Sequence, residues 1–191
     1  MTVKNELDNI WSELEADCLK KKDFRDAVIV TGKGPAPCRI MVVGEAPGRD
    51  ETRLKTPFVG KAGKFFISIL EEALGLKRSE IYISNVIKIW PKIETKRLKT
   101  RKPLKEEEAF FIPYLNREIS IVKPKVILAV GKTAFSALAP DQEFTPGKWV
   151  HKGNLRIMPI YHPSYILRRQ KSLEESTEKL RDALREVKAE L

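Results

Sequence analysis

The sequence predicts an α/β fold, namely a three-layer αβα sandwich with a central, mostly parallel, four-stranded sheet. Two observations indicate this class: short apolar runs alternate along the chain with segments of helical periodicity, and turns containing Gly or Pro separate them. Strands and helices that alternate at this spacing are typical of a parallel sheet covered by helices. A chain of 191 residues is long enough for one domain, which we expect to span residues 1–191.

The elements follow one another in a regular order. The expected strands are residues 39–43, 80–85, 126–131 and 155–162. The expected helices lie within residues 1–22, 62–74, 104–122, 132–138 and 172–191. Gly75 follows the second of these helices as a C-terminal cap. A basic loop over residues 92–105 precedes the third helix.

The composition favours a soluble, cytoplasmic protein that binds a polyanion. No apolar run approaches the roughly 20 residues that span a bilayer, and the first residues lack the apolar core of a signal peptide, so we expect no membrane partner. The formal net charge of +10 favours nucleic acid as the partner, although a merely solvated charged surface would give the same count. Two cysteines and two histidines argue against a structural metal site.

Four loops follow the expected strands, and in a parallel sheet they converge on one crevice outside the carboxyl ends of the strands. Their sequences are GEAPG (44–48), SNVIK (84–88), GKTA (131–134) and HPS (162–164). Each alone has an ordinary interpretation: GEAPG as a turn, Asn85 as a cap and His162 as a half-buried histidine. The dinucleotide fingerprint is missing and GKTA lacks the first half of a phosphate-binding loop, which argues against a nucleotide-binding regulatory domain.

Taken together, the motifs are far more specific. GEAPG (44–48), PFVGKAG (57–63), YISNVIK (82–88), VILAVGKTA (126–134) and HPSYILR (162–168) occur in an order that resembles the family 4 uracil-DNA glycosylases, from about Glu15 to Arg168. The resemblance implies a monofunctional DNA-repair enzyme that flips uracil out of DNA and hydrolyses its N-glycosidic bond, which starts base excision repair. Two alternatives stay open: a glycosylase of this fold acting on hypoxanthine or xanthine, and a non-catalytic protein that binds damaged DNA.

The resemblance also implies roles for residues in these loops. Phe58 matches the aromatic residue that stacks on the flipped base, and Asn85 matches the carboxamide that reads O4 and N3–H of uracil. His162 matches the group that faces uracil O2, where negative charge develops. Glu45 would orient water or stabilise the sugar cation, although family 1 enzymes place an aspartate one position later, where this chain has Ala46. The other residues expected to line the base pocket are Gly44, Ala46, Glu51 and Ser164.

The chain departs from the family at one group of positions. Family 4 enzymes usually carry a four-cysteine iron–sulfur cluster, and the corresponding positions here are Glu15, Cys18, Ile89 and Phe110. A single thiolate cannot hold a four-iron cluster. We therefore expect no iron–sulfur cluster and no other cofactor, with Cys18 as an inert buried residue.

The basic loop over residues 92–105 carries seven Lys and Arg residues against one Glu. We expect it to contact DNA phosphates beside the pocket; the alternative is a solvated, mobile loop. The expected phosphate contacts are Lys96, Arg97, Lys99, Arg101, Lys102 and Arg168. The loop contains no histidine, so the covalent trap of a related subfamily is not expected. We expect a monomer that acts on single- or double-stranded DNA.

Overall fold

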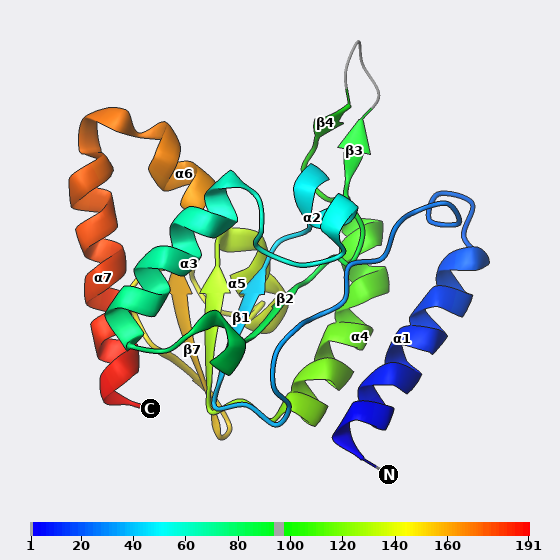
Figure 1. The fold of residues 1–191 in the computed structure, drawn as a ribbon, viewed down its shortest axis with the longest axis horizontal. Coiled ribbons are helices and arrows are strands. Elements are labelled where there is room, and N and C mark those ends of the chain that lie inside the picture. The colour runs from blue at the N-terminus through cyan, green and yellow to red at the C-terminus, as the bar shows by residue number, and fades with distance from the viewer. Residues whose placement is uncertain (1, 94–97) are drawn as a thin grey trace.

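The computed structural model describes residues 2–93 and 98–191. Its centre is a five-stranded sheet in the order β2-β1-β5-β7-β6 (Figure 1). Four of its strands run parallel to one another: β1 (Ile40–Gly44), β2 (Tyr82–Asn85), β5 (Val126–Val130) and β7 (Leu155–Ile160). These are the strands expected from the sequence, and the mostly parallel α/β architecture is confirmed.

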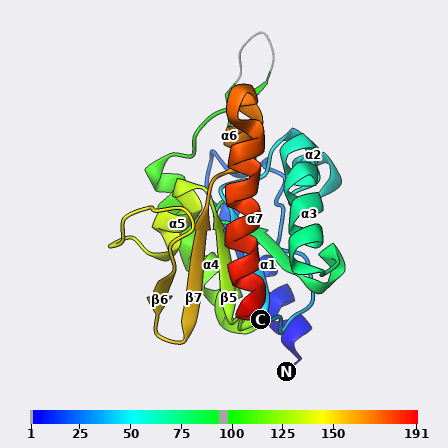
Figure 2. The ribbon, with the colours of Figure 1, turned by 90° about the vertical axis from the view of Figure 1, so that its left-hand side faces the viewer.

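Helices cover both faces of this sheet, which produces three layers (Figures 1 and 2). One face packs against α1 (Val3–Leu19), α4 (Lys105–Val122) and α5 (Lys132–Leu138). The other face packs against α3 (Lys61–Leu74), α6 (Pro163–Arg168) and α7 (Leu173–Ala189). Shorter helices are α2 (Arg49–Leu54) and two 3₁₀ turns, η1 (Arg78–Glu80) and η2 (Gln170–Ser172).

Strand β1 shows why the strands of this sheet appear in the sequence as continuous apolar runs. Successive side chains of a strand point to opposite faces of the sheet. Met41 and Val43 therefore pack into the core beneath α1 and α4, whereas Ile40 and Val42 pack into the core beneath α3 and α7. Because both faces are covered, every residue of β1 is buried and no polar alternation remains.

The structure adds a fifth strand that the sequence analysis did not predict. Strand β6 (Val150–Lys152) pairs antiparallel with β7 at the edge of the sheet. It is three residues long, and its side chains are half-buried or exposed. Edge strands are commonly short and charged, so no apolar run marks this one in the sequence.

Residues 92–105, expected as a loop, contain a two-stranded antiparallel ribbon. It consists of β3 (Lys92–Ile93) and β4 (Lys99–Thr100), and Lys105 already belongs to α4. Figure 1 shows the ribbon projecting beyond the sheet on the side of α2. Lys96 and Arg97 lie outside the described residues. Strands of two residues are too short to produce a periodicity that sequence analysis could detect.

The carboxyl ends of β1, β2, β5 and β7 lie at the same edge of the sheet, with Gly44 in register with Asn85. The loops GEAPG, SNVIK, GKTA and HPS all leave the sheet at this edge, as the parallel arrangement requires. In the described part of the chain, no helix combines the length and apolar content needed to cross a membrane.

Candidate active site

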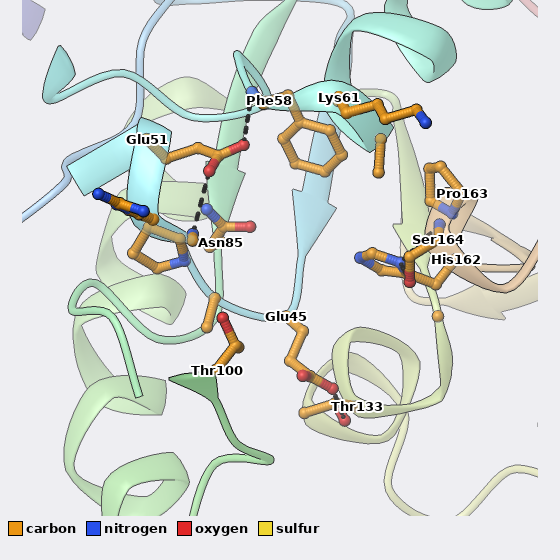
Figure 3. A pocket seen from close by; sticks show the side chains of 18 of the residues that line it. Glu45, Glu51, Phe58, Lys61, Asn85, Thr100, Thr133, His162, Pro163 and Ser164 are labelled. Atoms are coloured by element: carbon orange, nitrogen blue, oxygen red, sulfur yellow. Dashed lines mark hydrogen bonds between the residues drawn. The ribbon is translucent and has the colours of Figure 1, made fainter. Parts of the chain in front are cut away.

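The loops at this edge surround one cavity of about 730 Å³. The expected pocket residues that line it are Glu45, Ala46, Glu51, Phe58, Asn85, His162 and Ser164 (Figure 3). In Figure 3 the Phe58 ring, the Asn85 amide and the His162 ring lie around a common space, with the Glu45 carboxylate on its remaining side. Residues far apart in the sequence are thus brought together by the parallel sheet.

Gly44 makes room for two of these side chains. A Cβ atom at position 44 would lie 2.3 Å from Oδ1 of Asn85 and 2.7 Å from the Phe58 ring. Both distances are well below van der Waals contact, so any larger residue would displace Asn85 or Phe58. Glycine at this strand end therefore allows the two side chains to meet.

Phe58 has a left-handed backbone conformation, with φ of +56°. That conformation costs a non-glycine residue about 1–3 kcal/mol, so the surrounding contacts must impose it. The Arg78 guanidinium donates hydrogen bonds to the main-chain oxygens of Pro57 and Phe58. Gly63 lies against the Phe58 backbone, where a Cβ atom would come within 2.4 Å. These contacts hold the Phe58 ring against the cavity.

Glu51 connects two of the loops. Its Oε2 accepts a hydrogen bond from the Gly48 N–H at 3.2 Å, and its Oε1 accepts one from the Gly60 N–H at 2.9 Å. Gly48 belongs to GEAPG, and Gly60 belongs to the segment that carries Phe58. Although Glu51 lines the cavity, both of its carboxylate oxygens therefore bind the protein main chain.

Asn85 is the last residue of β2 and is 3% exposed. Its amide group points toward the cavity (Figure 3). Within the described residues, no hydrogen bond engages this amide, so its donor and its acceptor are available to a ligand. The main-chain carbonyl of Asn85, in contrast, accepts a hydrogen bond from Lys88 Nζ at 2.7 Å.

His162 is the N-cap of α6, and Figure 3 shows its ring beside the cavity. Its Nδ1 accepts a hydrogen bond from the Ser164 backbone N–H at 3.1 Å and lies 2.7 Å from Ser164 Oγ. Because a backbone N–H can only donate, the neutral ring carries its proton on Nε2. Burial lowers the pKa of His162 below its ordinary value of 6.5; the Glu45 carboxylate opposes this shift and Arg168 adds to it. At neutral pH His162 is therefore a neutral Nε2–H donor.

Glu45 is held by a residue that the sequence analysis did not name. The Thr133 hydroxyl, at the start of α5, donates a hydrogen bond to Glu45 Oε2 at 2.5 Å. This bond fixes one carboxylate oxygen of Glu45 and connects the loop after β1 to the loop after β5. The other carboxylate oxygen has no hydrogen-bond partner among the described residues.

Several basic side chains line the cavity. These are Arg49, Lys61, Arg101, Lys102, Lys132 and Arg168. The two terminal guanidinium nitrogens of Arg101 donate to the Glu107 carboxylate at 2.8 and 2.7 Å, so Arg101 attaches the ribbon to α4. Lys99 is exposed on the ribbon and does not line the cavity.

Comparison with known proteins identifies the family of this chain. Residues 31–188 match the family model of the uracil DNA glycosylase superfamily. A type-4 uracil-DNA glycosylase of Thermotoga maritima is 34% identical over 88% of this chain and 87% of its own length. Another, of Archaeoglobus fulgidus, is 36% identical over 76% of this chain and 75% of its own length. The chain belongs to the uracil-DNA glycosylase superfamily, as a type-4 member.

The four positions that the resemblance assigns to cluster ligands do not form a ligand set in the structure. Glu15 is exposed on α1, whereas Cys18 and Ile89 are each 3% exposed in the apolar core. Phe110 packs against two other phenylalanine rings, each at a centroid distance of 4.9 Å. Burial raises the pKa of Cys18 to about 11, which disfavours the thiolate. No three His, Cys, Asp or Glu side chains of the described residues could share a metal ion. These residues do not fit an iron–sulfur cluster.

Sequence reasoning missed two kinds of residue in the candidate active site. Thr133, Lys61 and Lys132 lie within the motifs GKTA and PFVGKAG, so the motifs themselves were the available signal. Arg78 lies outside every motif, and its bond to the Phe58 carbonyl depends on a contact between residues 20 positions apart. No local pattern marks such a residue.

His162 is expected to titrate below pH 6.5, with its neutral form protonated on Nε2, as measured by NMR of the ring nitrogens. Glu45→Gln removes a charge that raises this pKa and should move the midpoint to lower pH. Arg168→Ala removes a charge that lowers it and should move the midpoint to higher pH. Shifts in the same direction would contradict the assigned electrostatics. Because the folded pKa is depressed, the contribution of His162 to stability is complete above pH 6.5 and falls as the pH decreases toward the folded pKa.

Proposed function

We propose that this protein is a monofunctional DNA glycosylase that flips uracil out of DNA and hydrolyses its N-glycosidic bond. One observation carries the proposal: Phe58, Asn85 and His162 converge on one cavity. They supply a stacking surface, a pair of hydrogen-bonding groups for the pairing edge, and a donor for O2, which are the contacts that an extruded uracil requires. The curated relatives, which are named uracil-DNA glycosylases, support the same substrate.

Base recognition rests on Asn85 and Phe58. The Asn85 amide offers an acceptor for uracil N3–H and a donor for uracil O4. Cytosine presents an amino group and an unprotonated N3 at the same edge, so the amide would have to turn over to bind it. A site that leaves buried polar groups unpaired with the wrong base rejects that base strongly. The Phe58 ring supplies the apolar face against which the base stacks.

Bond cleavage rests on His162 and Glu45. When the bond between uracil N1 and the sugar C1′ breaks, the electron pair remains with uracil and negative charge develops on O2. The Nε2–H of His162 is a fixed donor at that oxygen, because Ser164 holds the other ring nitrogen. Glu45, fixed by Thr133, is placed to orient a water molecule or to stabilise the positive charge on the sugar. The water oxygen then bonds to C1′, and the proton that the water loses neutralises the uracil anion. The products are an abasic site and free uracil.

Binding to the DNA backbone rests on the basic residues that line the cavity and on those of the ribbon. Lys61, Lys132 and Arg168 line the cavity, and Lys99 and Lys102 are exposed on or directly after the ribbon. Lysine side chains in such positions can neutralise phosphates without reading the base sequence. Arg101 bonds to Glu107, so it is better suited to holding the ribbon in place than to binding phosphate.

We also propose that the enzyme works without an iron–sulfur cluster or another cofactor. The packing of Phe110 and Ile89 in the apolar core and the elevated pKa of the Cys18 thiol support this proposal. In place of a cluster, apolar contacts join α1 and α4 to the sheet.

Excision assays on oligonucleotides that carry uracil, hypoxanthine, xanthine or a thymine mismatch test the proposed function. Release of uracil is expected, with strand breakage only after alkali.

His162→Ala should slow single-turnover excision by about 10²–10³-fold, because it removes the donor at O2. Asn85→Asp should weaken discrimination between uracil and cytosine, because a carboxylate lacks the donor to O4. Full activity of His162→Ala would contradict its role, and binding without excision of any base would favour the damage-binding alternative.

The salt dependence of binding to duplex DNA tests the ribbon. Each phosphate contact adds about 0.9 to the slope of log affinity against log salt, so Lys99→Ala with Lys102→Ala should flatten the slope by about 1.8. The matched control is Lys77→Ala with Lys125→Ala. It removes the same charge from exposed lysines that precede β2 and β5, at the amino ends of the strands and away from the cavity. The rate on saturating uracil-DNA should not change in either variant. Equal slopes in the two variants would show that the ribbon is solvated surface.

Metal analysis tests the cofactor proposal. Protein purified without oxygen should be colourless, with no broad absorption near about 400 nm and no stoichiometric iron, because one cysteine cannot hold the cluster. Stoichiometric iron and sulfide in active protein would refute the proposal.

A further inference from the structure

Lys88 is completely buried directly behind the candidate active site. Its ammonium group donates to Glu118 Oε2 at 2.6 Å, to Ser84 Oγ at 2.6 Å and to the main-chain oxygen of Asn85 at 2.7 Å. Glu118, on α4, is also completely buried. One of these partners is thus the backbone of the residue that faces the base.

The surrounding groups complete this buried network. The Tyr82 hydroxyl donates to Glu118 Oε1 at 3.0 Å, and the Ser84 hydroxyl donates to Glu118 Oε2 at 3.0 Å. The Lys88 ammonium also lies 5.4 Å from the centre of the Trp11 ring. Buried ion pairs are often replaceable by apolar residues at no loss of stability, so stability alone does not account for this one. A fully connected polar network does, however, define one geometry.

That geometry fixes the peptide group after Asn85 at both of its ends. Lys88 Nζ binds the Asn85 carbonyl oxygen, and the N–H of Val86 donates to the Gly44 carbonyl at 2.9 Å. Among the described residues, no hydrogen bond holds the Asn85 side-chain amide itself. The direction of this amide therefore depends on packing and on the backbone that carries it.

We propose that Lys88, anchored by Glu118, is a positioning residue that fixes the backbone of Asn85 and thereby the direction in which its amide meets the pairing edge of the flipped base. This inference rests on the proposed excision of uracil. Lys88 touches neither base nor sugar; it acts through the main chain of Asn85. Its removal should therefore affect the rate and the choice of base more than the binding of DNA.

The test uses a variant that removes both charges of the buried ion pair together. Lys88→Met with Glu118→Met replaces the pair by apolar side chains of similar length; the Tyr82 and Ser84 hydroxyls lose their acceptor and the Asn85 carbonyl loses its donor, so the melting temperature should fall by several degrees while the protein remains folded. Its maximal single-turnover rate on uracil-DNA should nevertheless fall by about 10²-fold, because a small misplacement of a recognition group is enough for such a loss. The enzyme concentration for half-maximal rate should stay the same, and the preference for uracil over cytosine should decrease.

The matched control is Tyr82→Phe, which removes a hydrogen bond at the far end of the same network and leaves Lys88 on the Asn85 carbonyl. It should lower the melting temperature and retain the full rate. Glu118→Gln is the second variant: it keeps the shape of the side chain but removes the charge that anchors Lys88. Because it leaves the buried Lys88 ammonium without its counter-charge, it should melt at a lower temperature than Tyr82→Phe and lose more activity.

An NMR measurement gives a readout that does not depend on catalysis. The side-chain amide signals of Asn85, assigned by their loss in Asn85→Asp, should shift in the double methionine variant and stay in place in Tyr82→Phe. A double variant with full rate, full uracil preference and unshifted Asn85 signals would overturn the positioning role. An unmodified protein that excises no uracil would overturn the proposed function instead, while the Asn85 signals would still report whether Lys88 positions the amide.

Discussion

In the parallel pairing of β1 with β2, Gly44 lies opposite Asn85, and the Phe58 ring packs against the same point. The two side chains occupy the space that a side chain at position 44 would need. A slip of one residue in this register would reverse the faces of the strand and place Val43 beside Asn85. The candidate active site therefore depends on the register of the sheet, which both apolar cores hold in place.

Several residues of the site bind the protein rather than a ligand. Glu51 binds two backbone N–H groups, Thr133 binds Glu45, and Ser164 holds one nitrogen of His162. Their shared effect is to fix the Phe58 segment, Glu45 and His162 around the cavity, and in the proposed function these groups are then in place before DNA binds. Electrostatic stabilisation of a departing base is effective only if the donor is already in place, because no free energy is then lost in reorganising it.

The region behind Asn85 combines an apolar core with one buried polar network. Ile89, Phe110 and Cys18 belong to the core between the sheet, α1 and α4, and Lys88 directly precedes Ile89. The same two helices thus contact the aromatic core and, through Trp11 and Glu118, the ion pair behind the site. The packing of these two helices therefore also supports the strand end that carries Asn85.

The sequence by itself determined the order of strands and helices and the chemistry of the loops, because apolar periodicity and motif residues are local signals. It predicted Glu45, Phe58, Asn85 and His162 at one edge, since parallel strands bring their carboxyl ends together. Only the tertiary structure showed that Thr133 binds Glu45, 88 positions earlier, and that Glu118 binds Lys88, 30 positions earlier. It alone showed β6, the ribbon and the left-handed backbone of Phe58. The contacts of Thr133 and Glu118 join distant segments, which leave no periodic pattern in the chain, and β6 and the ribbon pair with neighbouring segments but are too short to produce one.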